Sequence, residues 1–173
     1  MNIKKIKGKI PRGLNMKNVF FYKTEIGNIM IAEDGKSITN LYFKEESELK
    51  EEYVIKETEL IKEAFKQLKE YFQGNRKFFE LPLEPSGTEF QRKCWKALLE
   101  IPYGHTRSYG EIAKRIGNPK ASRAVGLSNN RNPISIFIPC HRVIGANGKL
   151  VGYAGGLNVK EYLLNLEKQN AKG

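Results

Sequence analysis

The segment 75–87 interrupts the chain and separates two halves with different residue patterns. It contains Pro82, Pro85 and Gly87, and proline lacks the backbone N–H that a central strand or the interior of a helix needs. Short strand-like runs dominate before the segment, whereas helix start and stop signals dominate after it. For a chain of 173 residues, this predicts a small domain over 1–87 packed on a second domain over 88–173, with 75–87 as the linker.

The N-terminal half reads as a small sheet covered by a helix. Runs rich in β-forming residues occupy 19–24, 29–32 and 38–43, and Asp34-Gly35 is a strong hairpin signal before the last run. Apolar residues then recur at helical spacing over 60–72, and Gly74 ends that helix. The N-terminus, which begins Met1-Asn2-Ile3-Lys4-Lys5, is expected to form a basic arm, and the sequence does not decide between Met1 and Met16 as the start.

The C-terminal half carries a series of helix caps. Thr88-x-x-Gln91 and Ser108-x-x-Glu111 are capping boxes, which predict helices over 88–99 and 108–116. Asn118-Pro119 predicts an N-cap for a further helix over 119–126, and Asn158-x-x-Glu161 predicts the start of the last one. Two short helices joined at Gly117 describe a helix-turn-helix. The expected fold class is therefore α+β, with a small β-sheet and helix domain packed on a mainly α-helical domain that contains the helix-turn-helix.

Positive charge is concentrated in the second half. Residues 1–87 carry 16 basic and 14 acidic side chains, whereas residues 88–173 carry 14 basic and 5 acidic ones. Excess lysine can simply serve solubility, but a one-sided distribution is the pattern of a surface for a polyanion, most simply nucleic acid.

The helix expected at 119–126 is made mostly of small residues. A helix that reads base edges in the major groove usually carries long polar side chains, and here Arg123 is the only long side chain in its middle. Small residues permit close approach of a backbone, either to a narrow minor groove or to other helices in a core. They are Ala121, Ser122, Ala124 and Gly126.

The strongest chemical signal is the run Ile138-Pro139-Cys140-His141-Arg142-Val143. Thiolate is the reactive form of cysteine, and a neighbouring imidazole can accept the thiol proton. The other cysteine, Cys94, falls on the apolar face of its helix and is expected to be a core residue. Glu167 could turn inward to orient an imidazole, although a surface position is the commoner place for a glutamate.

The cysteine and histidine content argues against a metal and against a secreted disulfide protein. Residues 1–93 contain neither Cys nor His, and the few in the second half lack the spacing of a zinc finger. With two cysteines in all, a reducing compartment is expected. We therefore expect a cytoplasmic location, no metal, no cofactor and no membrane span.

Several short runs of the C-terminal half occur together in the order and at the spacing of one known family. They are Ser108-Tyr109, Asn118-Pro119-Lys120-Ala121, Arg123-Ala124-Val125-Gly126, Asn132-Pro133, Ile138-Pro139-Cys140-His141-Arg142-Val143 and Tyr153-Ala154-Gly155-Gly156-Leu157. With them, residues 88–168 resemble the O6-alkylguanine-DNA alkyltransferases, also called methylated-DNA–protein-cysteine methyltransferases. The N-terminal half agrees only in its coarse pattern.

The resemblance implies irreversible transfer of an alkyl group from O6 of guanine in double-stranded DNA to the protein, with the damaged base flipped out and the helix-turn-helix in the minor groove. Cys140 matches the alkyl acceptor, and His141 matches a general base that works through a bridging water. Glu167 matches the acid that orients this histidine. Asn132 matches the residue that ties the recognition helix to the active-site turn.

The resemblance also assigns residues to the substrate. Tyr109 matches the donor to the guanine ring, and Arg123 matches the finger that fills the gap left by the flipped base, on a helix whose small residues face DNA. The pocket walls and the loop over them match Val143, Tyr153, Ala154 and Lys160. Alanine at 154, where some relatives have serine, leaves only a backbone N–H for O6. The zinc that some relatives hold in the N-terminal part has no ligands in this sequence.

Two alternatives stay open at this point. One is a protein that binds alkyl lesions without catalysis, and the other is a Cys-His hydrolase, which needs an oxyanion hole and can take its catalytic pair from distant positions. The partner expected is double-stranded DNA containing O6-alkylguanine, bound by a monomer. Mass measurement of Cys140 after incubation with alkylated DNA distinguishes the alkyltransferase from both alternatives.

Overall fold

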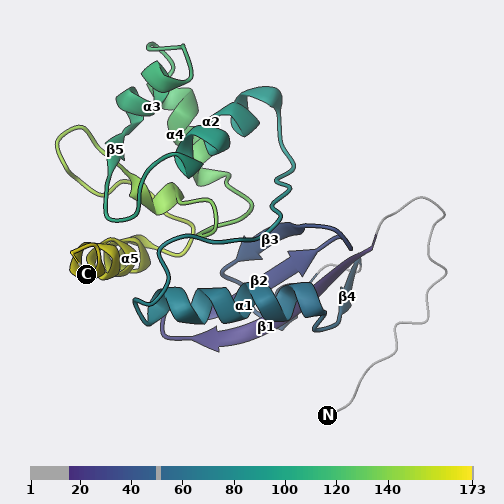
Figure 1. The fold of residues 1–173 in the computed structure, drawn as a ribbon. Coiled ribbons are helices and arrows are strands. Elements are labelled where there is room, and N and C mark those ends of the chain that lie inside the picture. The colour runs from purple at the N-terminus through teal and green to yellow at the C-terminus, as the bar shows by residue number, and fades with distance from the viewer. Residues whose placement is uncertain (1–15, 50–51, 173) are drawn as a thin grey trace.

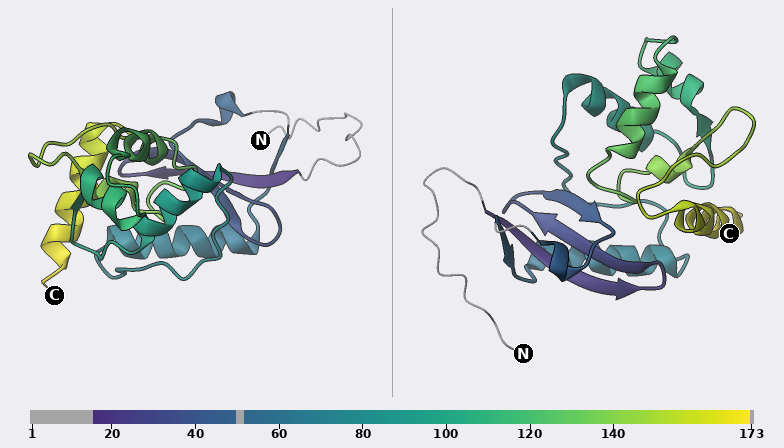
Figure 2. Two further views of the ribbon diagram at one scale, coloured as in Figure 1. Left: turned by 90° about the horizontal axis from the view of Figure 1, so that it is seen from above. Right: turned by 180° about the vertical axis from the view of Figure 1, so that it is seen from behind.

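The computed structural model describes residues 16–49 and 52–172 (Figure 1). The expected basic arm lies outside the described residues. The N-terminal strands and the long helix α1 form one side of the molecule, and the remaining helices form the other (Figures 1 and 2). The predicted α+β class is thus confirmed. No helix in the described ranges combines the length and the apolar character needed to cross a membrane.

A four-stranded sheet in the order β3-β2-β1-β4 forms the N-terminal side. Its strands are β1 (Lys17–Thr24), β2 (Gly27–Glu33), β3 (Ile38–Tyr42) and β4 (Tyr53–Ile55), with the short 3-10 helix η1 (Glu46–Glu48) before β4. β1 to β3 pair antiparallel, and β4 runs parallel to β1. The predicted hairpin turn is present, and Gly35 takes a φ of +94° there, which costs little in a residue without a Cβ.

Helix α1 (Glu59–Phe72) lies across one face of this sheet (Figure 1). The hydroxyl of Thr58 caps its first turn by accepting from the N–H of Ile61. Its apolar stripe is buried, as the helical spacing predicted, and includes Ile61, Ala64, Leu68, Tyr71 and Phe72. Burial of this stripe supplies most of the stability of such a helix.

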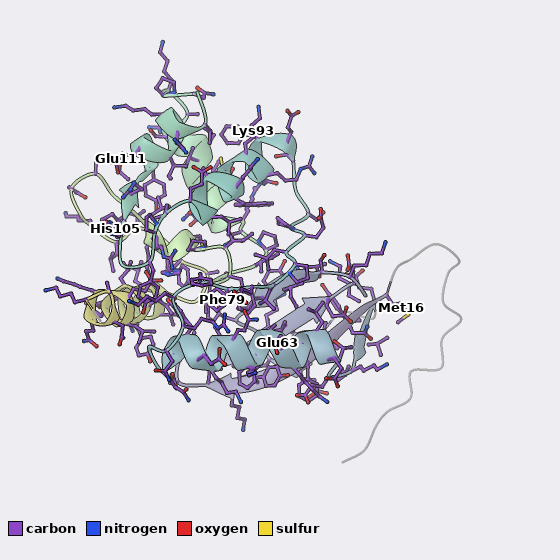
Figure 3. The ribbon with its side chains drawn as sticks, in the orientation of Figure 1. Met16, Glu63, Phe79, Lys93, His105 and Glu111 are labelled. Atoms are coloured by element: carbon purple, nitrogen blue, oxygen red, sulfur yellow. The ribbon has the colours of Figure 1, made fainter. Side chains whose placement is uncertain are left out.

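The segment expected to be a linker is paired with the edge of the sheet. The N–H of Ile38 donates to Pro82 O (2.8 Å), and the N–H of Glu84 donates to Ile38 O (2.9 Å). Further along the same strand, the N–H of Leu41 donates to Pro133 O (2.9 Å). Segments from both halves of the chain therefore cover β3, and the larger of the two apolar core clusters in the described residues extends through both halves. Figure 3 labels Phe79 at this seam, where its ring lies 4.7 Å from that of Phe137.

The C-terminal half consists of short elements around this seam. They are α2 (Glu89–Leu99), β5 (Arg107–Ser108), α3 (Tyr109–Arg115), α4 (Ser122–Asn130), the 3-10 helix η2 (Cys140–Arg142), β6 (Val143–Ile144) and α5 (Leu157–Asn170). Both capping boxes are formed, at Thr88 with Gln91 and at Ser108 with Glu111.

Two predicted helix starts are wrong. α4 begins at Ser122 rather than at Pro119, because Asn118 completes the end of α3: its N–H donates to Ala113 O (2.9 Å) while Gly117 takes a φ of +81°. A turn then leads into α4, in which the N–H of Ala121 donates to Asn118 O (3.0 Å). The helix also continues past the predicted end, to Asn130.

The last helix begins one residue before its expected cap. Gly156, at a φ of +92° and a ψ of 158°, is the N-cap residue of α5, and no side chain caps this end. Only glycine adopts this backbone conformation easily. Asn158 therefore lies inside the first turn and does not act as the cap.

Candidate functional site

Cys140 opens the 3-10 turn η2, directly below α4. Pro139 precedes it with a φ of −80°, and the N–H of Cys140 donates to Ile138 O (2.8 Å). The carbonyl of Cys140 accepts from Asn129 Nδ2 of α4 (3.2 Å). The thiol residue is 3 % exposed, so it is fixed inside the protein rather than carried on a surface loop.

The segment leading to the cysteine is held in a strained turn. Ile136 has a φ of +72°, which is rare for a β-branched residue, and the N–H of Phe137 donates to Ser135 O across it (2.9 Å). Asn132 braces the same segment: its Nδ2 donates to Ile138 O (2.8 Å), and its Oδ1 accepts from the N–H of Ile134 (3.0 Å). Strain of about 1–3 kcal/mol persists only where the surroundings enforce it, and the amide of Asn132 is part of those surroundings.

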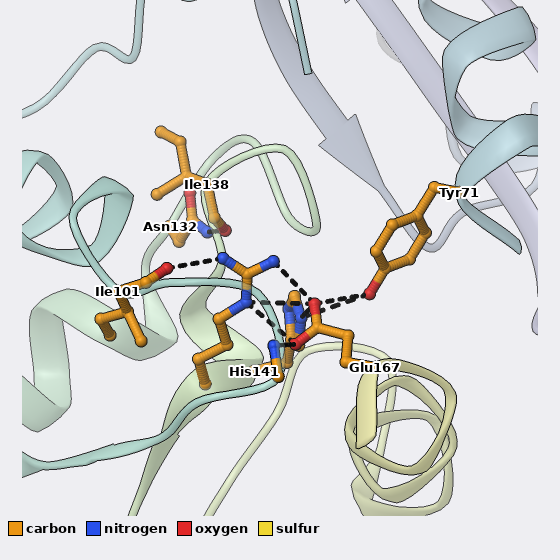
Figure 4. A network of polar contacts seen from close by, with 8 residues as sticks. Tyr71, Ile101, Asn132, Ile138, His141 and Glu167 are labelled. Atoms are coloured by element: carbon orange, nitrogen blue, oxygen red, sulfur yellow. Dashed lines mark hydrogen bonds and ion pairs between the residues drawn. The ribbon is translucent and has the colours of Figure 1, made fainter. Parts of the chain in front are cut away.

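Glu167 of α5 is completely buried and receives several donors (Figure 4). Its Oε1 lies 2.9 Å from His141 Nε2 and accepts from Arg142 Nη2 (2.7 Å). Arg142 Nε reaches both carboxylate oxygens at 3.0 Å. The hydroxyl of Tyr71 donates to Oε1 as well (2.9 Å). Glu167 therefore lies inside the protein beside His141, which is the position that the resemblance implied. The sequence analysis did not identify Arg142 and Tyr71 as its partners.

The carboxylate fixes the tautomer of His141. Burial alone would raise the pKa of Glu167, but His141 and Arg142 outweigh burial and lower that pKa from 4.5 to about 2. Because an ionised carboxylate only accepts hydrogen bonds, Nε2 of His141 carries the hydrogen. Nδ1 is buried and has no partner within the described residues. Burial lowers the pKa of His141, so the ring is a neutral base with its free lone pair on Nδ1.

Burial raises the pKa of the Cys140 thiol. This increase in the pKa is partly offset by hydrogen bonds with Asn132 and Ser135 and by the charge of Lys160. A thiol in this position is protonated at neutral pH, and it needs a base at the moment it reacts. His141, adjacent in the chain and uncharged, is the candidate for this base.

A loop near Cys140, which includes Val151 and Gly152, is held by two of the predicted pocket residues. The hydroxyl of Tyr109 donates to Val151 O (2.9 Å), and Lys160 Nζ donates to Val151 O (3.1 Å) and Gly152 O (3.3 Å). Val143 and the hydroxyl of Tyr153 are buried beneath. Ala154 is exposed in the same loop. Burial, followed by the charge of Cys140, raises the pKa of Tyr109.

Helix α4 presents an open face beside this loop. Arg123 and Ala124 are exposed, Leu127 is 60 % exposed, and Val125 packs into the core. Ala121, Ser122 and Gly126 are partly exposed. These predicted small residues therefore lie partly at the surface and partly against the rest of the protein. A Cβ placed on Gly126 would lie 3.7 Å from the ring of Tyr109, which shows how closely the helix approaches the site.

Cys94 is a core residue, as expected, and burial raises the pKa of its thiol. Across 16–49 and 52–172, no group of His, Cys, Asp and Glu is arranged to hold a metal ion. Two surface pockets lie away from Cys140. One is on the sheet beside Tyr42 and Tyr53, and the other lies between α2 and α3 beside Lys96.

Comparison with known proteins gives consistent matches over nearly the whole described chain. Residues 89–169 match the family model "6-O-methylguanine DNA methyltransferase, DNA binding domain", and residues 20–85 match the "ribonuclease-like domain" of the same family. A protein from Methanosarcina acetivorans named methylated-DNA–protein-cysteine methyltransferase is 57 % identical over 149 residues, covering 84 % of this chain and 95 % of that protein. A constitutive protein of that name from Bacillus subtilis is 49 % identical over 156 residues, covering 87 % and 94 %.

A solved structure agrees with these matches. OGT of Mycobacterium tuberculosis in complex with DNA has a TM-score of 0.83 and 48 % identity, covering 88 % of this chain and 94 % of that one.

Proposed function

The chain belongs to the 6-O-methylguanine DNA methyltransferase family, and we propose that Cys140 is the residue to which it transfers the alkyl group. The protein is a DNA repair methyltransferase that acts by direct reversal. The observation that carries the assignment of the acceptor is the arrangement of Cys140, His141 and Glu167, in which a buried carboxylate orients a neutral histidine beside a buried thiol.

The proposed step is a single displacement. Sγ of Cys140 bonds to the alkyl carbon, and the bond between that carbon and O6 of guanine breaks, with its electron pair going to the base. The thiol proton passes through a bridging water to Nδ1 of His141. Tyr109 donates a hydrogen bond to the guanine anion that remains in DNA, and this anion then takes up a proton from water. Guanine is restored in DNA, and Cys140 stays alkylated because thioethers are stable, so each molecule reacts once.

Positioning contributes more to this reaction than deprotonation. An ordinary thiol is roughly a few per cent thiolate at neutral pH, so complete ionisation accelerates attack at most about thirtyfold. Burial raises the pKa of Cys140, so proton removal has to accompany attack. The larger share of the rate acceleration comes from holding the alkyl carbon in line with the sulfur of Cys140 and from stabilising the guanine anion.

We propose that the loop at Val151 and Gly152 moves to admit the substrate, because Cys140 is only 3 % exposed. Tyr109 and Lys160 hold this loop through Val151 and Gly152. We propose that Val143, Tyr153, Ala154 and Lys160 then enclose the base, and that the hydroxyl of Tyr109 turns from Val151 to the guanine ring. The backbone N–H of Ala154 is the proposed contact for O6.

The protein binds DNA, and we propose that α4 enters the minor groove of duplex containing O6-alkylguanine. Its open face combines the exposed Arg123 with small residues, which suits close approach to a narrow groove. Arg123 is the proposed finger that replaces the flipped base. Asn132 ties this helix region to the active-site turn through Ile138 and Ile134.

We further propose a division at residue 87 into an N-terminal domain and a C-terminal domain that binds DNA and accepts the alkyl group. The protein is proposed to act as a monomer in the cytoplasm, where Cys140 stays reduced. Sedimentation of the free protein and of its DNA complex tests whether the protein is a monomer in both states.

The decisive experiment uses duplex DNA with a labelled methyl group on O6 of guanine and maps the label by mass spectrometry. We expect one equivalent per protein, on Cys140, and no transfer by Cys140→Ala even though it binds DNA. Cys94→Ala is the matched control and should transfer normally. Label on another residue, or repeated turnover by one molecule, refutes the assignment. Binding with no label on any residue would instead favour the lesion-binding alternative.

A further inference from the structure

Tyr71 reaches the site from the opposite side of the molecule. It lies on α1, in the half that carries the sheet, and its hydroxyl is 2.9 Å from Oε1 of Glu167 (Figure 4). Within the described residues, Glu167 accepts from three side chains, and the other two, His141 and Arg142, both come from η2. Tyr71 is therefore a polar side chain through which the N-terminal half contacts both the proposed proton acceptor and its carboxylate.

Packing fixes the position of this hydroxyl. Tyr71 is 0 % exposed, and its ring lies 5.4 Å from that of Phe79 and 6.1 Å, edge to face, from that of Tyr103. Burial, together with the charge of Glu167, raises the pKa of Tyr71 well above 10. The hydroxyl thus keeps its hydrogen and acts as a donor to the carboxylate.

Oε1 of Glu167 is shared by the hydroxyl of Tyr71 and Nε2 of His141, each at 2.9 Å. A donor on this oxygen limits rotation of the carboxylate and withdraws part of the charge that faces the imidazole. We propose that Tyr71 is a positioning residue for alkyl transfer: it holds Glu167 so that Nε2 keeps its hydrogen and Nδ1 stays free to accept the thiol proton. This inference rests on the proposed function.

The charged and titratable groups around His141 come from all the elements packed on it. They are Glu167 and Lys160 of α5, Arg142 of η2, Tyr71 of α1, and Tyr103 and Tyr153, which face Glu167. Of these groups, Tyr71 is the one whose hydroxyl donates to the same carboxylate oxygen, Oε1 of Glu167, as the imidazole of His141. Removal of this hydroxyl leaves His141 and Arg142 as the side chains that donate to Glu167 within the described residues, beside the backbone N–H of Gly104 (3.4 Å), and this favours the imidazolium.

Tyr71→Phe tests the proposal, with Tyr103→Phe as the matched control. The hydroxyl of Tyr103 is equally buried but has no hydrogen-bond partner in the described ranges. Both variants are first checked for native circular dichroism. Single-turnover transfer of labelled methyl to Cys140 is then measured as a function of pH. We expect Tyr71→Phe to slow transfer by about three- to tenfold at neutral pH.

The pH profile separates positioning from simple structural support. Because His141 is active only when neutral, the acid limb of the rate reports its pKa, and that limb should move to higher pH in Tyr71→Phe. Tyr103→Phe should leave both rate and limb unchanged. Replacement of Tyr71 by 3,5-difluorotyrosine, a stronger donor with the same packing, should move the limb to lower pH.

If the acid limb of the pH–rate profile lies at the same pH in Tyr71→Phe as in the wild-type protein, the positioning role is overturned, whether or not the rate falls. If Tyr71→Phe does not fold, the fluorinated protein decides the question by the direction of its shift, and no shift there also overturns the proposal. Failure of the wild-type protein to label Cys140 would instead count against the proposed function and not specifically against Tyr71.

Discussion

Replacement of Glu167 by glutamine removes the charge that several buried groups share. Glu167 is 0 % exposed, and Arg142, which contacts both of its oxygens, is 7 % exposed. Glu167→Gln keeps the shape of the side chain but leaves the guanidinium without a counter-charge in the interior. Loss of one partner from a buried ion pair costs about 3–5 kcal/mol.

The pKa of Glu167 gives an independent magnitude. Its value of about 2 lies below the 4.5 expected in the unfolded chain. Each pKa unit is worth about 1.4 kcal/mol, so ionised Glu167 contributes about 3 kcal/mol to folding at pH 7. Because the folded pKa is the lower one, this contribution is present above pH 4.5 and is lost as the pH falls from 4.5 towards 2. By the same relation, about 2 kcal/mol is left at about pH 3.5.

Urea unfolding of the wild-type protein and of Glu167→Gln, at several pH values, measures this contribution. We expect a difference of about 3 kcal/mol at pH 7 that narrows by about 1 kcal/mol by pH 3.5. The matched control is Glu100→Gln, which breaks the surface pair with Arg115 (2.6 Å, side chains 47 % and 67 % exposed). An exposed pair is worth less than about 1 kcal/mol. If both variants lose the same stability, or if the Glu167→Gln difference does not change with pH, the reasoning is refuted.

Three further outcomes are expected. Arg123→Ala should slow repair of alkylated duplex while leaving reaction with the free base O6-benzylguanine unchanged, and equal losses would contradict the finger role. Protein methylated on Cys140 should melt lower than unmodified protein by differential scanning calorimetry, because added volume in a packed interior costs about 1–3 kcal/mol; equal melting temperatures would contradict this. Gly104→Ala should destabilise the fold by about 1–3 kcal/mol more than Gly117→Ala. Both glycines have a φ near +80°, but only a Cβ on Gly104 meets another atom, 2.6 Å from Ala171 Cβ, so equal losses in thermal unfolding would show that the clash is relieved.

Helix α4 shows where reasoning from neighbouring residues reaches its limit. The capping boxes at Thr88 and Ser108 were predicted correctly because a cap is made by residues three apart. Asn118 satisfied the pattern of an N-cap equally well, yet it is used to end α3. Two adjacent helices compete for the same residue, and the local pattern does not show which helix receives it.

The local sequence determined the elements that depend on neighbouring residues: the hairpin at Asp34-Gly35, the amphipathic face of α1, and the placement of Cys140 beside His141 on a proline-stiffened turn. The tertiary structure alone decided that Tyr71, Arg142 and Glu167 meet. Their side chains lie on three different elements, and Tyr71 and Glu167 are separated by 96 positions in the chain. Such contacts follow from the packing of α1, η2 and α5 around one core, and a buried carboxylate is stable there only because these donors compensate its lost hydration.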